Sequence, residues 1–185
     1  MASVARESEP ELVRRAASGD PVAYDALVER YQGPLLTFAY RYLGDRQEAE
    51  DAAQDAFVRV YLSLWRLRRP ERFASYLFTA ALNTCRRRAR LRPEGPPVDP
   101  TARADDPQAT VLRAAEHQRV AAAIGALPDD YREVVSLRVG DDLGFADIGR
   151  IVGATEGACR VRFHRARAML RELLAASTEL SEERA

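Results

Sequence analysis

A stretch near the C-terminal end carries arginines at a spacing suited to nucleic-acid recognition. At helical period these arginines fall opposite a stripe of apolar residues, so one side of the expected helix would be buried and the other exposed. A guanidinium group donates paired hydrogen bonds to a guanine edge or to phosphate oxygens. The pattern therefore predicts a helix that can lie in a DNA groove. The exposed side carries Arg160, Val161, His164 and Arg165, and Arg162 flanks it.

A second stretch, residues 73–90, has a polar side that ends in a run of arginines. An aromatic ring can stack on a base and arginines can bind phosphates, which makes this side a candidate nucleic-acid surface. A solvated helix face explains the same residues about equally well. The polar side comprises Tyr76, Thr79, Asn83, Arg86, Arg87 and Arg90, and a basic loop with Arg68 and Arg69 precedes it.

Groups that catalyse reactions or bind metals are not brought together by this sequence. It has no nucleophile–base pair, no phosphate-binding glycine loop and no His/Cys cluster at metal-ligand spacing. His164 has no partner at useful spacing, so we expect it to face DNA or solvent. Cys85 and Cys159 occupy apolar positions, which predicts buried, reduced thiols. We expect a protein that is not an enzyme and needs neither a metal nor a cofactor.

Two helices joined by a tight turn would position the first arginine-bearing side. Residues 143–153 form the first helix, in which Gly149 and Gly153 remove side chains where a second helix would cross closely. Thr155 is a suitable N-cap for the helix that follows, over residues 155–174. This spacing predicts a helix-turn-helix, and an ordinary helical hairpin with a solvated basic face is the alternative. The expected packing stripe is Cys159, Phe163, Ala166, Leu170 and Leu173.

The N-terminal half is expected to form helices at residues 11–18, 21–43, 45–67 and 73–90. Asp20 is the N-cap of the second helix, and Gly44 closes it. Asp45 begins the third helix, with Glu48 as its capping-box partner. The apolar side of this third helix is rich in alanine. Its opposite side is acidic and polar, with Asp51, Gln54 and Asp55.

A proline-rich acidic segment divides the chain into two parts. The prolines of this segment, residues 93–107, disfavour regular structure, and its acidic residues outnumber its single arginine. We therefore expect a flexible, partly extended linker. Two more helices, at residues 107–127 and 128–140, precede the helix-turn-helix. We predict an all-α protein with two small helical domains, residues 10–92 and 108–177. The linker is residues 93–107, and tails lie at residues 1–9, expected to be disordered, and 178–185.

Composition limits the class of protein and the cellular compartment that we expect for this chain. It is 46% hydrophobic and 30% charged, which is typical of a globular protein. There is no signal peptide and no apolar run of ~18 residues, so we expect a cytoplasmic protein without membrane insertion. The zero net charge hides a sorted distribution, with acids gathered in residues 45–55 and arginines in residues 86–92. Charges act locally, so this sorting allows a DNA-binding role.

Three stretches together resemble the extracytoplasmic-function (ECF) sigma factors of bacterial RNA polymerase. The block YDALVERYQGPLLTFAYRYLGDRQEAEDAAQDAFVRVY resembles the helices of sigma region two, and FASYLFTAALNTCRRR resembles the helix that follows them. The block ALPDDYREVVSLRVGDDLGFADIGRIVGATEGACRVRFHRARAML resembles region four. The likeness covers about residues 10–174. The departures are Tyr76, where most members have Trp, and Gly144, Ala146, Gly149 and Val161.

The resemblance implies a role for each candidate surface. Such proteins bind core polymerase and direct it to promoters, and an anti-sigma protein commonly holds them inactive. The acidic helix side would dock on the clamp of the largest polymerase subunit, and the linker would thread toward the active-site cleft. One chain is expected per polymerase. The implied sites are Asp51, Gln54 and Asp55 for polymerase; Arg68, Arg69, Tyr76, Asn83, Arg86 and Arg87 for opening the −10 element; Arg160, Val161, His164 and Arg165 for reading the −35 element; and Thr155 and Arg162 for its phosphates.

Two other functions remain to be separated from this one. A DNA-binding regulator that does not bind polymerase would need only the C-terminal part. This function would leave the acidic helix side, the linker and the basic side of residues 76–90 unexplained. A helical scaffold or ligand-binding protein would show no salt-dependent promoter affinity. Binding to core polymerase discriminates between these functions.

Overall fold

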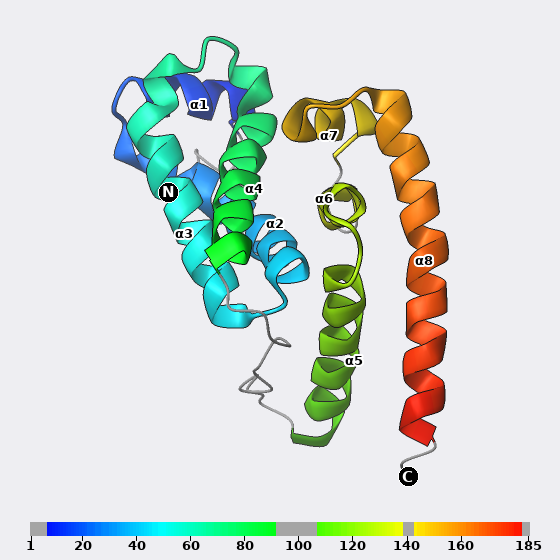
Figure 1. Cartoon of the computed structure of the whole chain (residues 1–185). Coiled ribbons are helices and arrows are strands. Elements are labelled where there is room, and N and C mark those ends of the chain that lie inside the picture. The colour runs from blue at the N-terminus through cyan, green and yellow to red at the C-terminus, as the bar shows by residue number, and fades with distance from the viewer. Residues whose placement is uncertain (1–6, 92–106, 139–142, 183–185) are drawn as a thin grey trace.

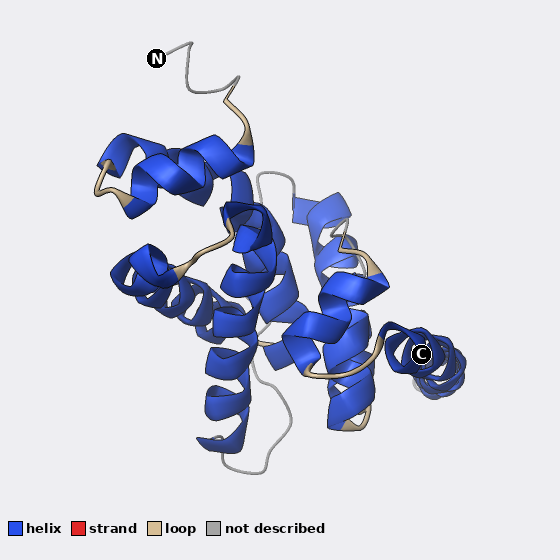
Figure 2. Ribbon diagram, turned by 90° about the horizontal axis from the view of Figure 1, so that it is seen from above, coloured by secondary structure: helices blue, strands red, loops and turns tan. Residues whose placement is uncertain are grey.

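The computed structural model describes residues 7–91, 107–138 and 143–182, and the regular elements in these ranges are all helices (Figure 2). This confirms the all-α fold class expected from the sequence. The expected linker lies outside the described residues except for Pro107, which begins a helix. Within the described ranges, no helix is both long and apolar enough to cross a membrane.

Four α-helices form the N-terminal half, residues 7–91 (Figure 1). The side chain of Asp20 accepts hydrogen bonds from the amides of the second helix, and Asp45 accepts one from the Glu48 amide at 2.8 Å. The expected third helix is α-helical only to Ser63 and continues as a 3-10 turn. The elements are α1 (Glu9–Ala17), α2 (Pro21–Leu43), α3 (Arg46–Ser63), η2 (Leu64–Arg66), η3 (Pro70–Arg72) and α4 (Phe73–Leu91).

Four further helices form the C-terminal half, residues 107–182. The last helix is longer than expected, because no Gly or Pro follows Leu174 and the residues beyond it include strong helix formers such as alanine, leucine and glutamate. The expected tail from residue 178 is therefore mostly helical. The elements are α5 (Pro107–Gly125), α6 (Asp129–Arg138), α7 (Phe145–Val152) and α8 (Glu156–Glu182).

The turn between α7 and α8 depends on two glycines in different ways. A Cβ on Gly149 would lie 2.6 Å from the carbonyl oxygen of Ala154, so this glycine allows the turn to approach α7 closely. Gly153 has open space around it and a φ of 74°, so its role is to supply the left-handed C-cap. The sequence prediction of close approach is confirmed at Gly149 and wrong at Gly153.

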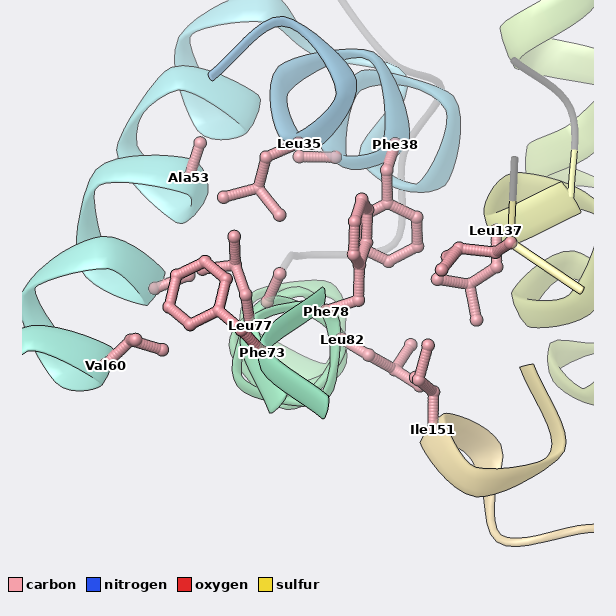
Figure 3. Close-up of a cluster of buried hydrophobic side chains, with 14 of the residues drawn as sticks. Leu35, Phe38, Ala53, Val60, Phe73, Leu77, Phe78, Leu82, Leu137 and Ile151 are labelled. Carbon is pink, nitrogen blue, oxygen red and sulfur yellow. The ribbon is translucent and has the colours of Figure 1, made fainter. Parts of the chain in front are cut away.

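A continuous apolar core joins the two halves. Phe38 of α2 and Phe78 of α4 meet edge to face, with ring centres 5.7 Å apart. Leu137 of α6 lies beside these rings, and Ile151 of α7 lies beside Leu82 of α4 (Figure 3). The sequence predicts both helical bodies but not this contact between them. The structure therefore shows a closed arrangement, in which α6 and α7 pack against α2 and α4.

Candidate nucleic-acid interface

The exposed side of α8 is positioned by a capped N-terminus and a buried stripe. The hydroxyl of Thr155 accepts a hydrogen bond from the Ala158 amide at 3.2 Å. Cys159 and Ala166 are fully buried, and the Phe163 ring meets Phe145 of α7 edge to face at 5.6 Å. One side of the helix is thereby held against α5, α6 and α7. Its opposite side is exposed as predicted, at Arg160, Val161, His164 and Arg165.

Two arginines on this helix already have carboxylate partners. Arg160 donates to Glu156 at 2.7 Å, and its guanidinium also lies over the Phe145 ring at 5.3 Å. Arg162 donates to Asp130 of α6 at 2.6 Å and is only partly exposed. These contacts hold both guanidinium groups close to the surface of the helix-turn-helix. A nucleic-acid phosphate would have to replace the carboxylate at each of them.

Val161 and Arg165 line an open hollow between the first turn of α8 and the start of α6. Val161 is half exposed, with 50% of the residue accessible. An exposed methyl beside an arginine is the combination that contacts a thymine methyl next to a guanine in the major groove. The geometry thus supports reading of base edges by this helix.

The polar side of α4 divides into two regions. Asn83, Arg86 and Arg87 surround a second open hollow near the end of the helix, together with Arg90. Tyr76 lies two turns earlier and is only partly exposed, because its hydroxyl donates to the Ser63 hydroxyl at 2.7 Å. The structure brings three of the predicted −10 residues together and leaves Tyr76 farther along the helix. Arg68 and Arg69 are exposed in the loop before α4.

Arg86 is engaged across the two halves. Its Nε and Nη2 atoms donate to the two carboxylate oxygens of Glu133 of α6, both at 2.7 Å. Glu133 is buried, with 5% of its surface accessible. The hydrogen bond to this carboxylate raises the pKa of the Arg86 guanidinium. A predicted DNA contact is therefore, in this arrangement, paired with a buried carboxylate, while the Arg86 side chain itself stays partly exposed.

The acidic side of α3 is tied to the arginines of α4. Arg88 donates to Glu48 at 2.8 Å and lies 3.5 and 3.3 Å from Asp51 and Asp55. Arg87 also reaches Asp55 at 3.3 Å. Part of the arginine run therefore points inward and joins two helices, a role that its charge alone does not reveal. Of the predicted polymerase-binding residues, Asp51 and Gln54 are exposed and Asp55 is partly exposed.

An exposed apolar face continues this same side of α3 and is not among the features predicted from the sequence. At 100° per residue, its members share a face with Asp51 and Gln54. The indole Nε1 of Trp65 donates to the Leu62 carbonyl at 3.2 Å, and the Arg66 guanidinium lies over its ring, so the indole is held in place. The signal available in the sequence is a second set of apolar residues at helical spacing, away from the core side. The apolar face is Val58, Tyr61, Leu62 and Trp65, each about half exposed or more.

The two cysteines are buried thiols, as expected. Burial raises the pKa of the Cys85 thiol to about 12 and also raises that of Cys159, so both stay protonated at neutral pH. Among the described residues, no three His, Cys, Asp or Glu side chains are grouped to hold a metal ion.

In a comparison with known proteins, the two halves match two regions of the same protein family. Residues 27–92 match the family described as Sigma-70 region 2, and residues 117–170 match Sigma-70, region 4. RNA polymerase sigma-H factor of Pseudomonas aeruginosa is 32% identical over 177 residues, which cover 88% of this chain and 91% of the relative. ECF RNA polymerase sigma factor SigW of Bacillus subtilis is 30% identical over 176 residues, with 88% and 94% covered.

Two solved structures are also similar to this chain. CnrH, in complex with the cytosolic domain of CnrY, is 29% identical with a TM-score of 0.75, and the match covers 92% of this chain and 99% of CnrH. RpoE of Bartonella quintana, in complex with the anti-sigma factor NepR, has a TM-score of 0.64 at 22% identity, with 82% and 96% covered, and supports the fold alone.

Proposed function

The chain belongs to the ECF sigma factors of RNA polymerase, and from this membership we propose how its surfaces divide the work of initiation. It is a transcription initiation factor and not an enzyme. Helix α3 docks on the clamp of the largest polymerase subunit, α4 opens the −10 element, and α8 reads the −35 element. One chain serves each polymerase, in the cytoplasm. The observation that carries this proposal is the exposed arginine-bearing side of α8, presented by a helix-turn-helix within region 4.

The polymerase-binding surface combines charge and apolar area on one helix side. Asp51, Gln54 and Asp55 occupy its first half, and the apolar face with Trp65 occupies its second half. Contiguous exposed apolar residues on a soluble protein mark sites where another protein binds. The acids would then select a basic partner and set its orientation, while the apolar residues supply most of the affinity.

Opening the −10 element requires a site for a base that has left the duplex. Unstacking a base costs a few kcal/mol, which contacts on the protein must offset. The half-buried Tyr76 ring supplies a stacking surface, and Asn83, Arg86 and Arg87 supply donors for the backbone. Arg68 and Arg69 extend this basic surface into the preceding loop.

Tyr76→Ala should lower open-complex formation by roughly 5- to 150-fold, because base–aromatic stacking is worth about 1–3 kcal/mol. Tyr76→Phe keeps the ring and loses only the hydrogen bond to Ser63, so its promoter opening should stay within about threefold of wild type. Permanganate reactivity of unpaired thymines in the holoenzyme complex measures this difference. Equal loss in both variants would mean that the hydroxyl, and not the ring, matters.

Reading of the −35 element is assigned to Arg160, Val161, His164 and Arg165, with Thr155 and Arg162 on the phosphates. The free energy for displacing Glu156 and Asp130 from their arginines is small, because both pairs are at least partly solvated.

Arg165→Ala should weaken binding of the holoenzyme to its promoter by about 1–3 kcal/mol and relax the base preference at one −35 position. Arg171→Ala removes the same charge from an exposed position two turns further along α8, so it is the matched control. Filter binding to a −35 substitution series measures both affinity and preference. A uniform loss across all −35 sequences in the Arg165 variant would show that the residue contacts phosphate only.

Run-off transcription with core polymerase on a promoter library tests the proposed function as a whole. Transcripts that start at a common spacing from shared −10 and −35 sequences are expected with the chain and not without it. DNA binding in the absence of any interaction with core polymerase would instead favour a plain DNA-binding regulator.

We also propose that an anti-sigma protein regulates this chain. The support is the similarity to CnrH, which was solved with a second protein bound. Isolation of the chain from cells should then recover a complex with a partner other than polymerase. Recovery of the chain only free or on polymerase would contradict this regulation.

A further inference from the structure

An ion pair between two helices lies at the edge of the surface proposed to read the −35 element. Arg162 of α8 donates to the Asp130 carboxylate of α6 at 2.6 Å. Both residues line the open hollow that Val161 and Arg165 also line. Asp130 therefore places a negative charge beside the side of α8 that is proposed to contact DNA.

Arg162 occupies a different helical position from the residues proposed to read bases. At about 100° per residue, it lies roughly 60° around α8 from the buried Cys159 and roughly 60° from the exposed Arg165. The Arg162 side chain is only 29% exposed, and its hydrogen bond to α6 directs it away from the exposed side of α8. A duplex that approaches this side therefore meets Val161 and Arg165 before it meets Arg162.

The pair of Arg160 with Glu156 is of another kind. These two residues lie four positions apart on α8, and more than half of each side chain is exposed. Such a pair on one helix is solvated and exchanges partners at little cost. Asp130 comes instead from a second helix, so its position relative to Arg162 is set by the packing of α6 against α8.

We propose that Asp130 is a specificity-determining residue, because it withholds Arg162 from the phosphates of DNA that lacks the −35 sequence. This inference rests on the proposed function of α8. Phosphate contacts supply affinity for any duplex and carry no sequence information directly. A contact that the protein makes only with the correct sequence therefore raises specificity.

The depth at which the duplex lies on α8 decides whether Arg162 takes part. A loosely placed duplex of the wrong sequence leaves Arg162 paired with Asp130. A duplex that lies deep enough for Val161 and Arg165 to reach base edges brings a phosphate to Arg162, and this phosphate replaces the Asp130 carboxylate. The displaced carboxylate is already largely solvated, with 64% of its side chain exposed, so the exchange costs little at the correct sequence.

Asp130→Asn tests this role in the holoenzyme, with two promoters that differ only in the −35 sequence. One carries the −35 sequence selected from the promoter library, and the other carries a scrambled one. At about 0.1 M salt, the variant should bind the scrambled promoter about 5- to 10-fold more tightly than wild type, because Arg162 gains a phosphate there. Affinity for the selected promoter should change by less than about twofold. Filter binding at several salt concentrations measures both affinities.

The salt dependence separates a new phosphate contact from a general change in stability. On the scrambled promoter, the slope of log K against log salt concentration should steepen by about 0.9 in the Asp130→Asn variant, the value for one more neutralised phosphate. In an Arg162→Ala background, Asp130→Asn should change neither the slope nor the affinity. A persistent effect without Arg162 would show that the carboxylate only repels DNA, and it would overturn the proposal.

Two matched variants control for charge and for side-chain shape. Asp129→Asn makes the same charge change one position earlier, at a carboxylate that pairs with Arg132 of α6 at 3.1 Å. Its ratio of selected to scrambled affinity should stay within about twofold of wild type. Asp130→Glu keeps the negative charge and should retain the wild-type ratio. An equal fall of the ratio in the Asp129 and Asp130 variants would overturn the proposal.

Failure of this inference and failure of the proposed function give different results. If the wild-type holoenzyme binds the two promoters equally well, α8 does not read the −35 element and the proposed function fails. If the wild type distinguishes the promoters and Asp130→Asn keeps the same ratio, the role of Asp130 fails alone.

Discussion

Replacing Leu62 and Trp65 together by glutamate should weaken binding of the chain to core polymerase by at least about 100-fold. Both side chains are 68% exposed on the apolar face of α3, so neither contributes much to the core of the fold. Large aromatic anchors at the centre of protein interfaces each contribute about 2 kcal/mol or more. The substitution also places two negative charges where we expect an apolar polymerase surface to bind. Burying these charges against that surface would be unfavourable.

Arg59→Glu is the matched control for this experiment. It changes the net charge by the same two units at an exposed position on another side of α3. Fluorescence titration of labelled chain with core polymerase gives the affinities, and circular dichroism confirms that both variants remain helical. Tight binding by the double variant would show that the apolar face is not part of the polymerase contact.

Phe78→Ala should lower the free energy of unfolding by about 3–5 kcal/mol, the range found when a buried phenylalanine is truncated. Phe78 is 1% exposed and packs against Phe38 at the junction of the two halves. Truncation leaves a cavity that faces helices from both halves, so neither half can fill it without disturbing the other. The loss should exceed that of any substitution on the apolar face of α3.

Urea denaturation followed by circular dichroism measures this effect. Leu62→Ala is the control, because a truncation at an exposed position should change the free energy by less than about 0.5 kcal/mol. Phe78→Leu retains most of the apolar volume and should fall between the two. A change below about 1 kcal/mol for Phe78→Ala would contradict the burial of Phe78 in the core.

Much of this fold is predictable because local chemistry specifies helix ends. Asp20, Asp45 and Thr155 accept the hydrogen bonds expected of N-caps, and Gly44 has the left-handed φ expected of a C-cap. The buried stripe of α8 and its exposed opposite side follow from the helical period alone. Such features depend on residues a few positions apart, which one sequence displays directly.

The remaining features depend on residues far apart in the chain. Helical period places Arg86 on the polar side of α4 and Arg88 on the side of Ala81 and Cys85, but it gives no information about which carboxylate each would meet. Glu133, 47 positions away, is the partner of the first, and acids of α3 are the partners of the second. The exposed Trp65 is missed for a related reason, since an apolar residue at helical spacing normally indicates a core.

Asp55 is shared by the side of α3 proposed to bind polymerase and the arginines of α4. One of its oxygens lies 3.3 Å from both Arg87 and Arg88. Removing this carboxylate would alter the polymerase contact and release a guanidinium beside the DNA at the same time. In a genetic selection, second-site suppressors of an Asp55 allele should therefore arise at Arg87 and Arg88 as well as in the polymerase subunit. An allele at Trp65 should yield suppressors in polymerase alone.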